Sequence, residues 1–163
     1  MTARSVGPLA PVWGLVGVSA LFASASYRLG ERGVDVIRDG LGGWEWAALA
    51  GLTAAFVYGE GFLALDRKWV PRLIRRIREL KRERNLVIRL LAPLYGLSLI
   101  GAPRRRLILS WLGMGAIVGA ILLVRAMPDP WRGIVDFAVA AALAWGLVSI
   151  LRRAPSIWSA GGG

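Results

Sequence analysis

One carboxylate in this sequence lies where its type and its neighbours could do chemistry. Glu60 stands between two glycines in the run Val57-Tyr58-Gly59-Glu60-Gly61-Phe62, inside an otherwise uncharged apolar stretch from Trp46 to Leu65. An ionisable side chain at the centre of a membrane costs about 2.5–3.5 kcal/mol, so its presence needs a reason. Flanking glycines permit local unwinding, which exposes backbone carbonyls as in transporter ion sites. Glu60 is therefore either a proton or cation site or an acid that pairs with an arginine or a partner subunit.

A second acid, Asp136, lies within an apolar stretch near the C-terminus. Glu60 follows Trp44 by about 24 Å of helix, in a hydrocarbon core of about 30 Å, whereas Asp136 is about 7 Å past Trp131. These depths put the two acids in opposite leaflets, too far apart to share one proton or one metal ion.

Each acid has an arginine in its own leaflet. We expect Asp136 to form a structural ion pair with Arg125, which lies just across a short connection. Arg104, Arg105 and Arg106 begin the same span at its other end, within reach of Glu60 if their long side chains extend along the helix.

Other common chemistry is missing from the sequence. The chain has no histidine and no cysteine, which removes histidine-ligated haem, the usual zinc and copper sites and thiol chemistry. Phosphate-binding loops, nucleophile elbows and acids at metal-ligand spacing are also absent. We therefore predict no enzyme, no metal and no cofactor, although a lipid or pigment between helices stays open.

The elements that position the two acids are expected to be membrane helices. The 163 residues are 56% hydrophobic, carry a formal charge of +11, and separate long apolar runs from short basic blocks. A membrane span needs about 20 apolar residues, and only helices or closed barrels satisfy the backbone there. We predict a single all-α domain over 1–163, a four-helix transmembrane bundle with spans at about 7–27, 44–65, 107–124 and 131–151.

Basic residues indicate the orientation of these spans. The connection from Asp66 to Arg106 holds thirteen basic residues against three acids, whereas 28–43 holds three of each. Positive charge concentrates on the cytoplasmic side. We therefore expect a bacterial-type inner (plasma) membrane protein with both termini and the middle connection in the cytoplasm.

Two segments allow alternatives. The first run ends in Ala23-Ser24-Ala25, which resembles a signal-peptide cleavage site, but we expect a retained span. The run 90–102 is apolar but short and contains Pro93 and Gly96, so we expect an interfacial or re-entrant segment, with a fifth span as the alternative.

The middle connection, about 67–103, is predicted to contain a basic amphipathic helix on the inner membrane surface. Its apolar residues recur at helical spacing and its other faces are basic. These basic residues predict a surface for anionic lipid or for a partner subunit, and no nucleic-acid module accompanies them. The residues are Arg72, Arg75, Arg76, Arg78, Lys81 and Arg82.

Small residues at four-residue spacing are the remaining signal, because they let membrane helices approach closely. The predicted packing positions are Gly51, Ala55, Gly59, Gly115 and Gly119, with a similar series at Ala138, Ala142 and Gly146. Two functions follow as hypotheses. The first is a non-catalytic membrane subunit or assembly factor that binds other membrane subunits or itself, and the second is a small oligomeric transporter or channel that uses Glu60.

Overall fold

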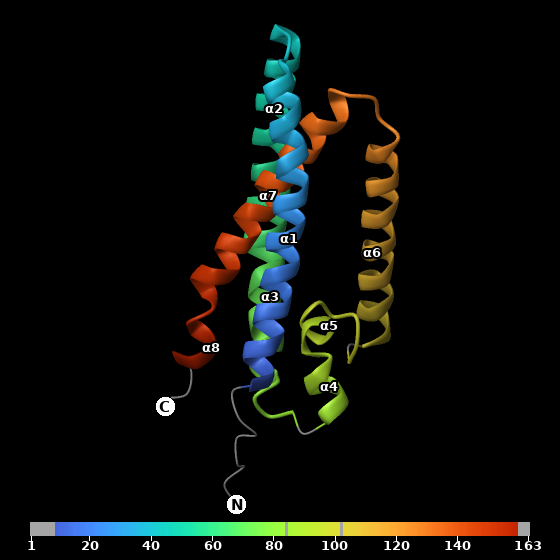
Figure 1. Ribbon diagram of the computed structural model, residues 1–163. Helices are drawn as coiled ribbons and strands as arrows, with labels where there is room; N and C mark the ends of the chain where they lie inside the picture. The colour runs from blue at the N-terminus through green and yellow to red at the C-terminus, as the bar shows by residue number, and fades with distance from the viewer. Residues whose placement is uncertain (1–8, 84, 102, 160–163) are drawn as a thin grey trace, which may run out of the picture.

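The computed structural model describes residues 9–83, 85–101 and 103–159, and every element in that part of the chain is helical (Figure 1). In chain order the helices are α1 (Leu9–Asp39), α2 (Gly43–Phe56), the π-helix η1 (Val57–Trp69), α3 (Val70–Glu79), α4 (Leu86–Leu90), α5 (Ala92–Gly96), α6 (Arg104–Arg125), α7 (Trp131–Arg153) and α8 (Ser156–Ser159).

Four helices of the described chain are long and apolar enough to cross a membrane, which confirms the number of predicted spans. They cover Leu9–Asp39, Gly43–Glu79, Leu107–Arg125 and Trp131–Ser159. The predicted start of the first span at Gly7 lies outside the described residues. The first two helices continue well past the predicted spans, because the charged residues that follow each apolar run are also compatible with helix.

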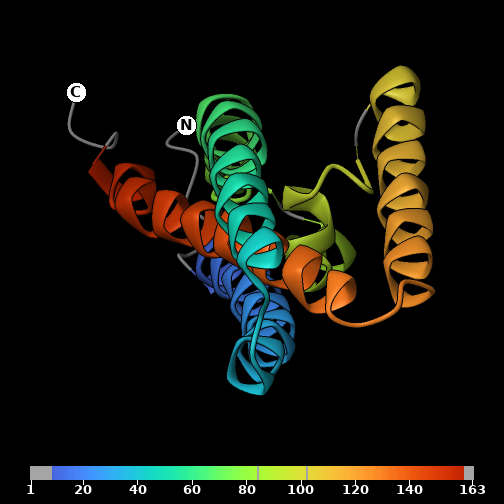
Figure 2. The ribbon, with the colours of Figure 1, turned by 90° about the horizontal axis from the view of Figure 1, so that it is seen from above.

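Helix α7 lies at the centre of the bundle, between α1 on one side and α2 with η1 on the other (Figure 2). Small residues make this central position possible, since a helix with short side chains can be approached closely from both sides. A side chain on Gly33 of α1 would collide with Phe137, and one on Gly133 of α7 would collide with Val36. Both neighbours approach Gly146 of α7, where an added Cβ would lie 2.7 Å from Leu65 Cδ1 of η1 and 3.0 Å from Phe22 Cε1 of α1.

The second long helix is continuous from Gly43 to Glu79 but changes geometry in its middle. Over η1 the backbone bonds reach five residues back, so that the amide of Val70 donates to the carbonyl of Leu65. Beyond η1, α3 continues the same helix past α1 and α7 (Figure 1). Its apolar stripe forms the main core with residues of α1, α7 and α8: Leu15, Val18, Val70, Leu73, Ile74, Ile77, Ile150 and Ile157.

The described part of the segment 90–102 contains one short helix, α5, and begins at the last residue of α4, and neither helix approaches the length of a span. Helices α4 and α5 have five residues each, and α5 packs against α1 and α3. Ala92 is completely buried, and a Cβ on Gly17 of α1 would collide with Pro93. A fifth span is therefore not formed here, because tertiary contacts fold the segment back onto the bundle.

Helix α6 stands apart from the other long helices and joins α7 through a short loop (Figures 1 and 2). The most apolar window of this helix has 0% of its residues buried, compared with 44% for the helix that contains α7. The third span therefore contributes almost nothing to the core of the single chain.

Candidate functional site

Glu60 lies in the π-helix η1, with its side chain exposed on the outside of the bundle. Among the described residues it forms no ion pair or hydrogen bond. An exposed carboxylate on a span-length helix is costly in lipid unless water, a cation or another chain meets it.

The two glycines beside Glu60 differ in their surroundings. Gly59 faces open space, whereas a Cβ on Gly61 would lie 3.2 Å from Trp145 Cβ and 3.4 Å from the carbonyl oxygen of Ala142. Gly61 therefore packs η1 against α7, and the chain around it stays helical rather than unwinding. The Glu60 carboxylate therefore points outward from a continuous, widened π-helix and not from a break in the helix.

The arginines predicted near Glu60 lie on α6, which stands apart from η1 (Figure 2). Arg104 and Arg105 are exposed, and the side chain of Arg106 lies outside the described part of the structure. Neither Arg104 nor Arg105 forms an ion pair with Glu60 in this chain.

Asp136 is buried in α7, with 6% of its surface exposed. Its nearest cation is Arg132, one turn earlier on the same helix, at 3.9 Å between Arg132 Nε and Asp136 Oδ2. The predicted partner, Arg125, is exposed at the end of α6 and forms no ion pair with Asp136. The helical i,i+4 geometry places Arg132 closer than any side chain across the loop.

The predicted small-residue faces separate into two kinds. The series on α7 is used inside the fold, since Ala138, Ala142 and Gly146 are all buried. The faces on α2–η1 and on α6 are open: Gly51, Gly59, Gly115 and Gly119 have no atom within 4 Å of an added Cβ, and Ala55 is exposed. Only the first kind packs helices within this chain.

The six basic residues predicted to form one surface also divide. Arg76 is buried and donates to the carbonyls of Tyr95 at 2.8 Å, Ile100 at 3.0 Å and Gly101 at 3.2 Å. Its guanidinium also stacks over the Tyr95 ring at 4.1 Å.

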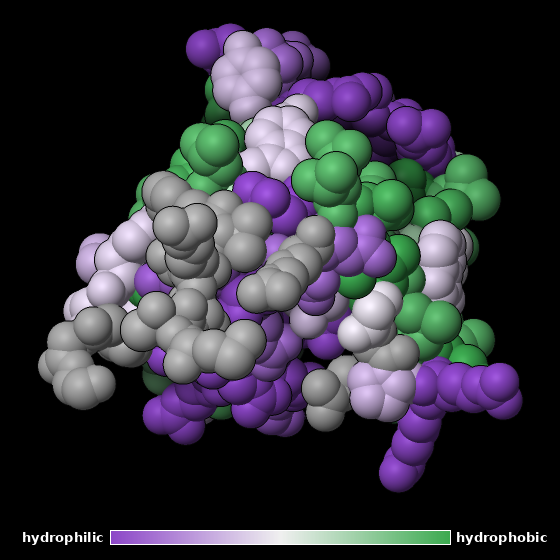
Figure 3. All heavy atoms as spheres, turned by 90° about the horizontal axis from the view of Figure 1, so that it is seen from below, coloured by the Kyte–Doolittle hydropathy of each residue, from purple (hydrophilic) through white to green (hydrophobic). Residues whose placement is uncertain are grey.

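Two more of these residues join α3 and the turn that follows it to α8. Arg78 donates to the carbonyl of Ser156 at 2.7 Å, and Lys81 donates to the carbonyl of Ile157. The remaining three, Arg72, Arg75 and Arg82, are exposed. Figure 3 shows this end of the molecule from below, where hydrophilic side chains gather beside a hydrophobic flank.

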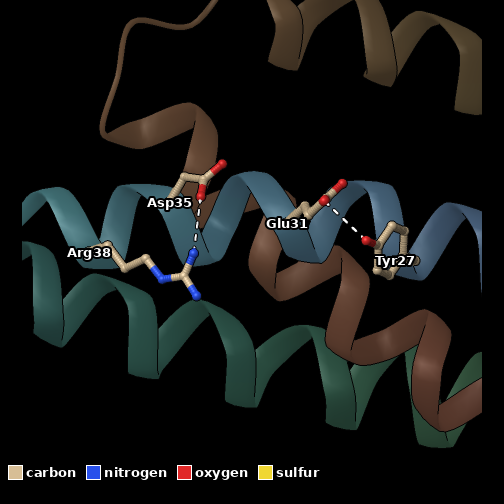
Figure 4. Close-up of polar contacts among 4 residues, drawn as sticks. All are labelled: Tyr27, Glu31, Asp35 and Arg38. Atoms are coloured by element: carbon tan, nitrogen blue, oxygen red, sulfur yellow. Dashed lines mark hydrogen bonds and ion pairs between the residues drawn. The ribbon is translucent and has the colours of Figure 1, made fainter.

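Two polar features were not predicted from the sequence. Arg153 at the end of α7 forms a 2.8 Å ion pair with Asp66 of η1. A row of polar side chains, Tyr27, Glu31, Asp35 and Arg38, follows one face of α1 (Figure 4). Their spacing of three or four residues is the available signal, but an exposed helix face shows the same spacing.

The described residues contain no group of three acids that could hold a metal ion. The described residues thus form an all-helical protein with four helices long and apolar enough to cross a membrane, and its notable polar groups are an outward carboxylate, an internal arginine network and a row of charged side chains on α1. No protein-family model, curated protein or solved structure matches it.

Proposed function

We propose that this protein is a non-catalytic integral membrane subunit or assembly factor of a larger membrane complex. The observation that carries this proposal is the exposure of α6, whose most apolar window has 0% of its residues buried while Gly115 and Gly119 face open space. Glycines on a lipid-facing helix leave a shallow groove in which a second helix can pack closely.

The α2–η1 face supports the same function. Gly51 and Gly59 are open, and Glu60 is exposed beside them. A partner helix on this face would remove the carboxylate from lipid and could supply a cation or a hydrogen-bond donor. The exposed Arg72, Arg75 and Arg82 each add about 1 kcal/mol of attraction to anionic headgroups near the surface. Because positive charge concentrates on the cytoplasmic side, these residues also orient this end of the protein toward the cytoplasm of an inner membrane.

The test is the size of the particle that contains the protein after mild extraction from its native membrane into polymer nanodiscs. We expect an assembly heavier than the 17.6 kDa chain with its lipid belt. Replacing both Gly115 and Gly119 with leucine should release the lone chain. Gly113→Leu is the matched control, because Gly113 is equally open but lies on another side of α6. A lone wild-type chain, or an assembly unaffected by the double replacement, would refute the proposal.

A second candidate is a small oligomeric transporter or channel for protons or cations with Glu60 as the coupling residue. Its support is the location of this exposed acid in a π-helix, a geometry often associated with functional sites. Proteoliposomes with a pH-sensitive dye test it: Glu60→Gln should abolish a proton or cation flux that the wild-type protein shows. An unchanged flux would eliminate this role for Glu60.

A further inference from the structure

A groove runs along one face of α1, beside α7, and has a volume of about 640 Å³. The residues of α1 that line it recur every three or four positions from Ala23 to Arg38. Phe137 and Leu147 of α7 form the opposite wall. The groove is open along its length, as expected for a site entered sideways from a bilayer rather than from water.

The character of the groove changes along its length. Its inner part is bounded by Ala23 and Leu147, and Ser26 and Tyr27 also line it before Gly30. The Ser26 hydroxyl is already used inside the bundle, since it donates a 2.8 Å hydrogen bond to the carbonyl of Ala140, so this part is less polar than the outer one. Its outer part carries Glu31, Asp35 and Arg38. The distance along α1 from Ala23 to Arg38 is about 22 Å, close to the length of a phospholipid headgroup together with much of one acyl chain.

The polar end holds charges of both signs in one row (Figure 4). Glu31 accepts a 3.1 Å hydrogen bond from the hydroxyl of Tyr27 and keeps its other oxygen for a ligand. Arg38 Nη1 lies 3.7 Å from Asp35 Oδ1, a distance too long for a direct hydrogen bond. The two side chains are 75% and 65% exposed, respectively. A ligand can therefore reach both the carboxylate and the guanidinium.

This end of α1 lies near a membrane surface. Helix α1 has 31 residues, or about 46 Å, whereas a hydrocarbon core is about 30 Å thick. Its apolar part begins at Leu9, so the charged end from Glu31 to Asp39 extends into the headgroup region. Acids at this depth meet the ammonium groups of lipids, and an arginine meets their phosphates.

We propose that this groove binds a zwitterionic phospholipid with a primary ammonium headgroup, of the phosphatidylethanolamine type. The ammonium donates hydrogen bonds to Glu31 and Asp35, and Arg38 binds the phosphate. One acyl chain lies on the apolar surface between Ala23 and Leu147. A quaternary ammonium has no N–H to donate, and an anionic headgroup would be repelled by the two carboxylates.

Native mass spectrometry of the intact protein from micelles with equal amounts of phosphatidylethanolamine, phosphatidylcholine and phosphatidylglycerol tests this assignment. We expect the wild-type protein to retain phosphatidylethanolamine over phosphatidylcholine by about tenfold, the effect of one or two charge-assisted hydrogen bonds. The double variant Glu31→Gln with Asp35→Asn should lose this preference. Asp39→Asn, an exposed acid outside the groove on the same helix, is the matched control.

A second variant separates headgroup recognition from a failure to fold. Ala23→Leu narrows the apolar end without touching a charge, and should lower retention of every lipid in the groove while leaving headgroup preference intact. Arg38→Gln should weaken binding of phosphatidylethanolamine and phosphatidylcholine alike, because both carry the phosphate. Equal retention of the three lipids by the wild-type protein, or a preference that survives the double variant, would overturn the proposal.

Discussion

Arg153 donates a 2.8 Å hydrogen bond from Nη2 to Oδ1 of Asp66, and this ion pair joins the last turn of α7 to the π-helix η1. Asp66 is buried, with 8% of its surface exposed, whereas Arg153 is partly exposed. The contact links residues 87 positions apart and closes the bundle at the level where α3 begins. It also relieves the cost of an acid at the end of the apolar stretch.

Removing the cation of this pair should destabilise the fold. Arg153→Gln leaves the buried Asp66 carboxylate without its charged partner, so we expect the free energy of unfolding to fall by about 1–3 kcal/mol. Reversible unfolding in detergent, followed by circular dichroism, measures the change. Arg152→Gln is the control because Arg152 is exposed, and an equal loss in both variants would show that the ion pair contributes nothing.

Gly33 should tolerate no side chain. A Cβ there would lie 2.5 Å from Phe137 Cβ and 3.0 Å from Phe137 Cα, so α1 and α7 would have to separate. We expect Gly33→Ala to cost about 1–3 kcal/mol of unfolding free energy. Gly51→Ala should be neutral or stabilising by up to about 1 kcal/mol, since that face is open and alanine is the better helix former. Thermal unfolding of both variants tests the contrast; equal midpoints would contradict it.

Arg76 should hold the chain between α5 and α6 in place. Arg76→Lys keeps the charge but cannot reproduce three carbonyl contacts and the stacking on Tyr95, because lysine lacks the planar fork. We expect hydrogen exchange of the amides at 97–101 to accelerate about tenfold or more. Arg75→Lys, on the exposed side of the same helix, should leave that exchange unchanged. Unaltered protection in Arg76→Lys would mean that the segment is held by apolar packing alone.

Tyr95 should make the stability of the protein fall at alkaline pH. Partial burial raises the pKa of Tyr95 above its ordinary value near 10; the charge of Arg76 opposes this shift, and the 3.1 Å hydrogen bond from the Tyr95 hydroxyl to Glu79 Oε2 adds to it. The folded state therefore keeps this proton more tightly than the unfolded state. The resulting stability is fully present below pH 10 and is lost as the pH rises through the folded-state pKa.

Tyr95→Phe removes that titration. We expect the variant to lose less stability than the wild-type protein between about pH 10 and pH 12, measured by chemical denaturation at several pH values. Tyr58→Phe, at an exposed tyrosine, serves as the control. Parallel curves for wild type and Tyr95→Phe would refute the prediction.

The exposed basic residues should act on lipid rather than on the fold. Replacing Arg72, Arg75 and Arg82 with glutamine should reduce the retention of anionic lipid while the unfolding midpoint stays unchanged. The guanidinium of Arg78 donates a hydrogen bond to the carbonyl of Ser156, so Arg78→Gln should lower the unfolding midpoint instead. Lipid quantification after purification and thermal unfolding separate the two effects, and a triple variant that unfolds early would contradict the division.

The sequence by itself determined the number of membrane-length helices and their approximate positions. Hydrophobicity over about 20 residues is a local property, and in lipid a single span must satisfy its own backbone, so composition is enough. Small-residue spacing likewise marked helix surfaces suited to close approach. Neither signal states which of those surfaces meet.

Tertiary structure decided the partners. The small-residue faces share one spacing pattern, yet only the face on α7 lies between other helices. Helix α7 packs against neighbours on two sides, whereas α6 remains outside the bundle. Arg76 and Arg75 are adjacent basic residues in the sequence, but the direction of each side chain on α3 makes one an internal anchor and the other a surface charge. Asp66 and Arg153 are separated by 87 positions, and only the crossing of η1 and α7 brings them together. Contacts between distant segments depend on helix packing, which no local pattern encodes.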